Sequence, residues 1–196
     1  GGGHRRDPIA GVHHSYIVDL SQIVARPRGT EDGNSTVSDN DLTTRQVHAF
    51  FDAVNLPSFR VEAAPRRAWL KGLAADGVTP RAFCDQLDRW KRANAEGRDV
   101  FVRAEAQDDG RFPAIAMVDD LDAPSVAQMT QDGFEPSAVV ETSPGNMQAW
   151  VRLADEPIDG AVLTRARAEL ADYYGGDPHA ARRPDQAGRP PGLTNQ

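Results

Sequence analysis

The chain has 196 residues, 39% of them hydrophobic and 26% charged, and a formal net charge of −7. This composition predicts one globular domain with a sizeable core, no membrane-spanning segment and little tendency to bind DNA nonspecifically. Cys84 is the only cysteine, which excludes an internal disulfide and a multi-cysteine zinc site and favours a reducing cytoplasm.

Residues 1–40 are rich in Gly, Pro, Ser, Thr, Asn and Asp around one apolar stretch at 16–20. They predict a flexible N-terminal arm that is not a signal peptide, followed by a domain over residues 41–196. Between Arg60 and Arg103 there are ten Lys and Arg against six Asp and Glu. This local charge of +4 permits a groove that follows nucleic-acid phosphates.

Helical and strand patterns alternate along the domain. In chain order they predict a helix over 43–54, a strand over 59–63, a short helix over 68–75, a helix over 80–96, strands over 99–103 and 114–118, a helix over 123–132, strands over 137–142 and 147–153, a helix over 160–173 and a loop over 175–196. We expect the strands 99–103 and 114–118 to pair as a hairpin. The order predicts an α+β fold, with an antiparallel or mixed RRM-like sheet and helices packed on one side.

The apolar run 114–118 leads directly into Asp119 and Asp120. Because side chains alternate along a strand, the two carboxylates can meet one cation only if the strand ends or bends there. Adjacent carboxylates repel, and a divalent ion such as Mg²⁺ relieves that repulsion while it binds water and substrate phosphates as well. The alternative is a solvated acidic turn after a core strand.

Three further features could complete such a site. Ser143-Pro144-Gly145-Asn146 is a turn with donors suited to phosphate oxygens, Asp177 follows two glycines, and Arg189 lies in a basic loop. Carboxylates for metal and donors for phosphate are what phosphoryl or nucleotidyl transfer requires. Taken singly, they are also an ordinary turn, a turn residue and a surface charge.

Several segments resemble successive motifs of the RepB-type plasmid primases, which belong to the archaeo-eukaryotic primase-polymerase superfamily. They are Trp90–Arg103, Met117–Leu121, Val140–Val151, Tyr174–Asp177 and Gly188–Asn195. The resemblance covers about residues 59–195 and is most specific in the run ETSPGN-x-QAWV. One departure is the absence of a histidine that the wider superfamily carries in its second motif.

The resemblance implies a primase-polymerase catalytic core that synthesises primers on single-stranded DNA from nucleoside triphosphates, with Mg²⁺ or Mn²⁺. As catalytic metal ligands it implies Asp119, Asp120 and Asp177. As nucleotide or phosphate contacts it implies Ser143, Gly145, Asn146, Gln148 and Arg189. A replicative helicase and a C-terminal helical domain are further implied partners, which would make residues 1–196 a catalytic fragment.

Two other functions remain open from the residues. One is a catalytically silent module of the same fold that binds single-stranded DNA or a replication origin, and the other is a metal-dependent nuclease. Exposed aromatic residues on the sheet would favour the binding module, because such residues stack on bases.

Overall fold

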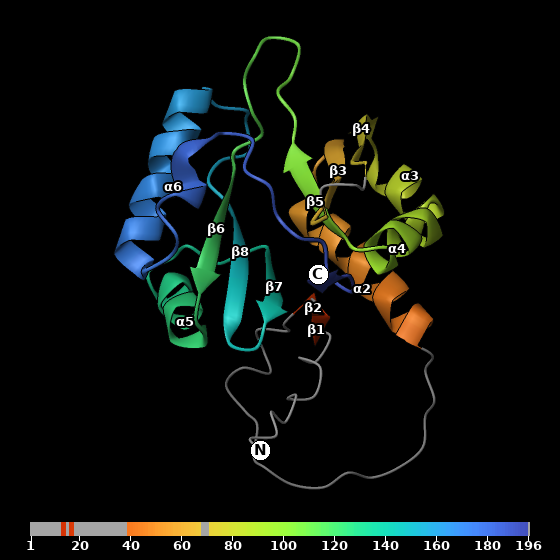
Figure 1. Cartoon of the computed structure of the whole chain (residues 1–196). Helices are drawn as coiled ribbons and strands as arrows, with labels where there is room; N and C mark the ends of the chain where they lie inside the picture. The colour runs from red at the N-terminus through yellow and green to blue at the C-terminus, as the bar shows by residue number, and fades with distance from the viewer. Residues whose placement is uncertain (1–12, 15, 18–38, 68–70, 196) are drawn as a thin grey trace, which may run out of the picture.

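The protein is described by a computed structural model over residues 13–14, 16–17, 39–67 and 71–195 (Figure 1). Its elements follow in this order: β1 (His13–His14), β2 (Tyr16–Ile17), α2 (Asp39–Val54), β3 (Phe59–Pro65), β4 (Leu73–Val78), α3 (Pro80–Asp85), α4 (Leu87–Ala95), β5 (Arg98–Ala104), β6 (Ile115–Leu121), α5 (Ala123–Gln131), β7 (Ala138–Ser143), β8 (Asn146–Arg152), α6 (Gly160–Tyr174), a short 3₁₀ helix (Ala180–Arg182) and β9 (Thr194–Asn195). No helix in these ranges is long and apolar enough to cross a membrane.

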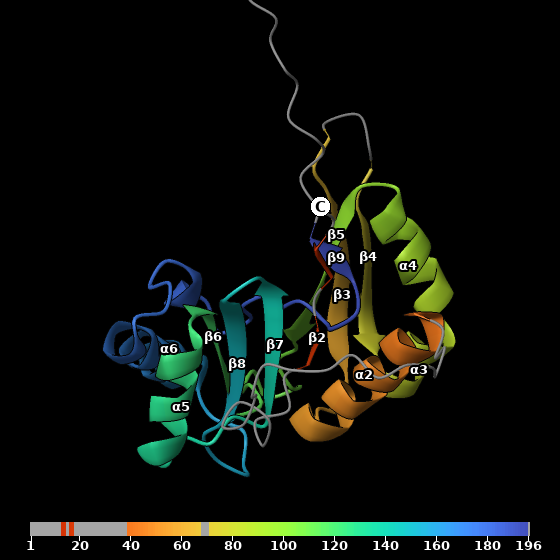
Figure 2. The ribbon, with the colours of Figure 1, turned by 90° about the horizontal axis from the view of Figure 1, so that it is seen from below.

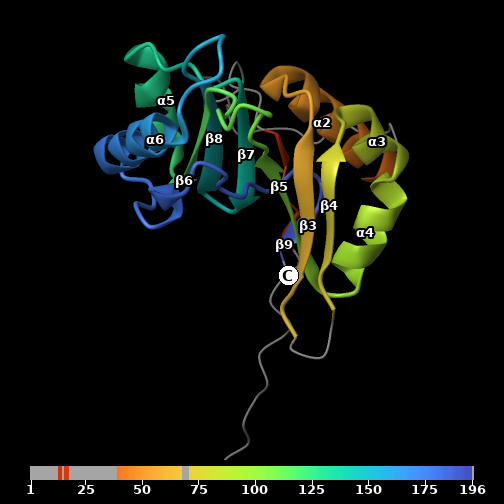
Figure 3. The same ribbon diagram turned by 90° about the horizontal axis from the view of Figure 1, so that it is seen from above.

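The strands form two main sheets. The large sheet has the order β2-β7-β8-β6 and the small sheet the order β4-β3-β5, while β1 and β9 make a separate pair. Neighbouring strands are antiparallel throughout the pairings. Helices α5 and α6 cover the large sheet on its outer side, and α3 and α4 cover the outer side of the small sheet (Figures 1 and 3). The predicted α+β class is therefore confirmed, with two sheets in place of one.

The predicted hairpin between 99–103 and 114–118 is wrong. β5 pairs with β3, as in the register Val61↔Val102, whereas β6 pairs with β8, as in Met117↔Trp150. The connection between β5 and β6 carries the chain from the small sheet to the large one. Residue patterns identify strands but not their partners, so nearness in sequence was a poor guide here.

The predicted helix over 68–75 is also wrong in the part that the structure describes. Leu73–Val78 is the edge strand β4, paired with β3 through Val61↔Ala75. Leu73 and Ala75 are partly buried against the core, while Ala74 and Asp76 are exposed. Pairing with β3 thus overrides the helical preference of an alanine-rich stretch.

The other predicted helices are present, but the one predicted over 80–96 is divided at Gln86 into α3 and α4. α2 begins at Asp39, earlier than predicted, and it buries one stripe made of Val47, Phe50, Phe51 and Val54. Thr79 caps α3, since its side-chain oxygen accepts a hydrogen bond from the main-chain N–H of Ala82 at 3.1 Å.

α2 joins the cores of the two sheets. The ring of Phe50 packs edge-on against Trp150 of the large sheet, with centroids 5.3 Å apart. The ring of Phe51 lies 4.7 Å from Phe59 of the small sheet and 5.0 Å from Phe83 of α3. One helix therefore buries aromatic surface from both sheets, which fixes one sheet relative to the other.

The segment after α6 is loop-like, as predicted, but it is packed rather than free. It runs between the two sheets to β9, as Figures 2 and 3 show. Gly188 pairs with Val102 of β5, and a Cβ atom at Gly188 would lie 2.1 Å from Cζ2 of Trp150. Only glycine lets the chain pass through this narrow space between the sheets.

The predicted N-terminal arm lies almost wholly outside the described residues. The exceptions are β1, which pairs with β9, β2, which adds an edge strand beside β7, and Asp39 and Asn40, which begin α2.

Candidate active site

A bulge in β6 brings the two adjacent carboxylates together. The register of β6 on β8 shifts between Val118 and Leu121, so Asp119 and Asp120 lie opposite Gln148 alone. Val118 and Leu121 both belong to the apolar cluster under α5 and α6, although strict alternation would place them on opposite faces. The extra residue thus leaves both carboxylates on the face away from those helices. The bend that the sequence required is present.

The bulge includes a strained backbone conformation at Asp120. Its φ angle is +65°, a left-handed conformation that residues other than glycine rarely adopt. Such conformations cluster at functional sites, where the surrounding structure maintains them.

The Asp119 carboxylate lies in an environment that disfavours its charge. Burial raises the pKa of Asp119 above its usual range, and the neighbouring charge of Asp120 raises it further. Hydrogen bonds from the Gln148 side chain and from the main-chain N–H of Asp120, together with the charge of Arg189, oppose the shift without cancelling it. A bound cation would supply the missing compensation.

The hairpin turn between β7 and β8 contacts this carboxylate pair. The Asn146 side-chain amide donates to Oδ1 of Asp120 at 2.6 Å. Gly145 has a φ angle of +78°, and its main-chain N–H donates to Oε1 of Glu141 at 2.8 Å. The predicted phosphate-binding turn is therefore beside the carboxylates, with the Gly145 N–H directed to Glu141.

Asp177 reaches the pair through the backbone. Its main-chain N–H donates to the carbonyl oxygen of Asp119 at 3.0 Å. A Cβ atom at Gly176 would lie 2.7 Å from that same oxygen, so glycine is needed for the approach. Oδ1 of Asp177 accepts a hydrogen bond from the His179 main-chain N–H at 2.8 Å.

The other acidic residues near these motifs have different roles. Asp122 caps α5, and its hydrogen bonds with Ser125 lower its pKa. Asp172 is exposed on α6, and both oxygens of Asp185 accept from Arg183 at 3.0 Å. Neither Asp172 nor Asp185 is therefore placed as a candidate metal ligand.

Gln148 and Arg189 are joined by a hydrogen bond. Gln148 is 3% exposed, and its Oε1 accepts from the main-chain N–H of Arg189 at 2.9 Å. The Arg189 guanidinium donates to Oδ1 of Asp99 at 2.9 Å and lies 4.8 Å from the centre of the Phe101 ring. Asp99 and Phe101 were not predicted as site residues. Asp99 and Phe101 alternate with the apolar residues Val100 and Val102 along the chain. This alternation was the one sequence pattern that could have indicated a second face of β5, opposite its apolar face.

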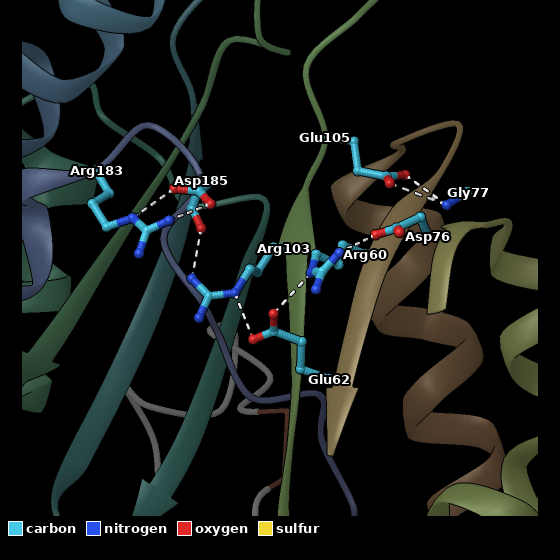
Figure 4. Close-up of polar contacts among 8 residues, drawn as sticks. All are labelled: Arg60, Glu62, Asp76, Gly77, Arg103, Glu105, Arg183 and Asp185. Atoms are coloured by element: carbon cyan, nitrogen blue, oxygen red, sulfur yellow. Dashed lines mark hydrogen bonds and ion pairs between the residues drawn. The ribbon is translucent and has the colours of Figure 1, made fainter. Parts of the chain in front are cut away.

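A ladder of charged residues continues this second face of β5 (Figure 4). Arg103 donates to Glu62 at 2.9 Å and to the carbonyl oxygen of Asp185 at 2.9 Å. Glu62 also accepts from Arg60, which in turn pairs with Asp76. The ladder pairs acids with arginines and ties the segment after α6 to the small sheet.

The acidic side chains of the site fit a divalent metal only in part. In the ranges that the structure describes, no three His, Cys, Asp or Glu side chains are placed to hold a metal ion together, so the carboxylates of Asp119, Asp120 and Asp177 do not form one group. Asp119 and Asp120 nevertheless supply the two oxygen ligands that Mg²⁺ or Mn²⁺ commonly takes from a protein before substrate phosphates and water complete its shell. The same ions would also balance the charge of the ionised Asp119 carboxylate, which the surrounding donors compensate only in part.

Comparisons with known proteins give a consistent result. The family model of the RepB DNA-primase N-terminal domain matches residues 54–196. Mobilization protein A of Escherichia coli is 41% identical over 197 residues, which is 95% of this chain and 27% of that protein. The chain thus spans about a quarter of that relative's length.

Solved structures show the same fold. The crystal structure of primase RepB′ matches 78% of this chain and 51% of that one, with a TM-score of 0.69 and 28% identity. The catalytic domain of primase RepB′ in complex with initiator DNA matches 77% of each chain, with a TM-score of 0.67 and 27% identity. The AEP domain of the cyanophage S-2L primase-polymerase matches 74% of this chain and 80% of that one, with a TM-score of 0.51; its 18% identity supports a shared fold alone. The predicted primase-polymerase core is confirmed.

Proposed function

The chain belongs to the RepB DNA-primase N-terminal domain family, and we propose that it is the catalytic domain of a DNA primase. It would extend primers on single-stranded DNA with nucleoside triphosphates, in the replication of a plasmid or another mobile element. The observation that carries the proposal is the bulge in β6. It sets Asp119 and Asp120 side by side, with the main chain of Asp177 bonded to Asp119.

Asp119, Asp120 and Asp177 would hold Mg²⁺ or Mn²⁺. When bound, such ions lower the pKa of the primer 3′-hydroxyl and neutralise charge on the triphosphate. The Asn146 amide orients the Asp120 carboxylate through their hydrogen bond. Phosphate oxygens would be bound by Ser143, Gly145 and Asn146 of the turn and by Arg189, once the triphosphate competes with Glu141 and Asp99 for these donors.

The proposed template is supported by a relative. A RepB′ catalytic domain of the same family fold was solved with initiator DNA, and we propose a DNA strand as the template here too. The chain matches 27% of the length of mobilization protein A, and we propose a C-terminal helical domain as a further partner. A replicative helicase is a further proposed partner.

Template-directed extension is the direct test. The chain is incubated with a single-stranded template, nucleotides and Mg²⁺ or Mn²⁺, with Asp119→Ala as the matched control. We expect longer products with the native chain, and none with the control or after chelation of the metal. Retention of the strand without extension would indicate a binding module, and shortening of the strand would indicate a nuclease.

A further inference from the structure

Gln148 occupies a position that demands full hydrogen bonding. It lies on β8 opposite the bulge of β6, and only 3% of its surface is exposed. A buried carboxamide with an unmet donor or acceptor costs about 1–3 kcal/mol. We therefore expect each end of this amide to have a partner within the protein.

The orientation of the amide follows from its partners. The main-chain N–H of Arg189 can only donate, so the group 2.9 Å from it must be the oxygen of Gln148. The NH₂ group is then turned away from Arg189. It is the end available to the Asp119 carboxylate, which can only accept when it is ionised.

The segment that carries Arg189 is itself held at several points. Asp99 of β5 accepts from the Arg189 guanidinium, and Gly188 exchanges main-chain hydrogen bonds with Val102 at 2.8 and 2.9 Å. A continuous series of contacts therefore runs from β5 in the small sheet through Arg189 and Gln148 to Asp119 in the large sheet.

We infer that Gln148 is a positioning residue, which fixes the Asp119 carboxylate against the segment after α6 instead of contacting a substrate phosphate. This inference rests on the proposed function, because it gives Asp119 a metal to hold. It differs from the phosphate contact that the family resemblance implies for Gln148. Burial favours the positioning role, since the amide oxygen accepts from the Arg189 main-chain N–H and Gln148 lies opposite the bulge that carries Asp119.

Groups that orient a metal ligand have a measurable effect. Their loss typically costs 10–100-fold in metal affinity, because the free carboxylate samples orientations that do not bind. A phosphate contact would instead raise the KM for nucleotide and leave binding of the bare metal unchanged. The two roles therefore predict opposite patterns.

The test measures Mn²⁺ binding in the absence of nucleotide, by electron paramagnetic resonance, on the whole chain. Gln148→Met keeps the length of the side chain and removes both polar groups. Gln148→Asn keeps the amide but is one methylene too short to span both partners, and it serves if Gln148→Met fails to fold. The matched control is Gln186→Met. Gln186 is also a buried glutamine, but it lies in the segment after α6, and its Oε1 has no partner among the described residues.

We expect the Kd for Mn²⁺ to rise tenfold or more in Gln148→Met or Gln148→Asn and to stay within twofold in Gln186→Met. In extension assays at saturating metal, kcat should fall while the KM for nucleotide changes less than twofold. Unchanged Mn²⁺ affinity with a raised KM would overturn the positioning role.

Asp119→Ala separates this inference from the proposed function. If it binds Mn²⁺ as tightly as the native chain, the metal assignment fails and the inference fails with it. If Asp119→Ala loses Mn²⁺ while both Gln148 variants keep it, the positioning role alone is wrong.

Discussion

The two sheets handle acidic residues in opposite ways. On the small sheet, Glu62 accepts hydrogen bonds from two arginines, and Asp99 is paired with both Arg66 and Arg189. On the large sheet, Asp119 and Asp120 are adjacent carboxylates, and their closest donors are amides. Arginines therefore balance the acidic side chains of the small sheet, whereas the carboxylate pair of the large sheet keeps its negative charge.

The difference separates interactions that maintain the fold from those that prepare a site. Exposed ion pairs contribute about 0–1 kcal/mol each, so the ladder stabilises the segment after α6 only modestly. Two adjacent like charges, one of them half-buried, oppose folding, and proteins retain such arrangements mainly where function requires them. Substitutions on the two faces should therefore have opposite effects on stability and activity.

The largest expected effect is at the carboxylate pair. Asp119→Ala or Asp120→Ala should reduce extension to background while the free energy of unfolding stays equal or rises, because each removes repulsion. The folded-state pKa of Asp119 is raised, so its ionised form disfavours folding above that pKa, and the gain from Asp119→Ala should be largest at neutral pH.

Asp122→Ala is the matched control for that experiment, because Asp122 belongs to the same acidic run but caps α5. It should keep extension and lose about 1 kcal/mol of stability. Extension assays and urea denaturation measure the two quantities. Full activity in Asp119→Ala or Asp120→Ala would rule out the metal assignment.

Asp177→Asn should lower metal-dependent extension by orders of magnitude with little loss of stability. The main-chain bond to Asp119 survives this change, and only the ligand charge is removed. Asp172→Asn and Asp185→Asn should retain extension, because one side chain is exposed and the other is paired with Arg183. If all three variants lost extension equally, the loss would reflect the change in overall charge, and Asp177 would not be a metal ligand.

Trp150→Ala should cost about 3–5 kcal/mol of unfolding free energy, as expected for a large aromatic side chain removed from a core. Trp150 is 2% exposed, packs against Phe50 and lies directly under Gly188. Tyr173→Ala, at an exposed aromatic residue of α6, should change stability by less than about 0.5 kcal/mol. Unchanged stability with weaker DNA binding in Trp150→Ala would make Trp150 a base-stacking residue.

The smallest effect is expected on the ladder. Burial alone would raise the pKa of Glu62, but hydrogen bonds from Arg60 and Arg103 outweigh it and lower that pKa below 4.5. Glu62→Gln should therefore lose on the order of 1 kcal/mol at pH 7. The loss should disappear as the pH falls through the folded-state pKa of Glu62, where the native carboxylate is protonated. Urea denaturation at pH values from 7 down past the folded-state pKa of Glu62 measures this change, and a difference that persists below that pKa would contradict it.

Local features of the chain were predictable from the sequence. The apolar stripe of α2, the Thr79 cap and the turn before Asn146 all depend on residues within a few positions of one another. The candidate carboxylates could also be selected, because paired Asp residues at the end of a buried strand are informative without knowledge of any partner.

Pairing between distant segments was decided only by the tertiary structure. Periodicity could not show that β5 and β6 belong to different sheets, or that the stretch around Ala75 is drawn into a strand by β3. The bulge that gathers Asp119 and Asp120 depends on the register with β8, and the orientation of Gln148 depends on a main-chain N–H 41 positions away. Residue types determined which chemistry was available to this protein. Long-range hydrogen bonding and packing decided which of those residues meet, because register and close approach are properties of two segments together and not of either one alone.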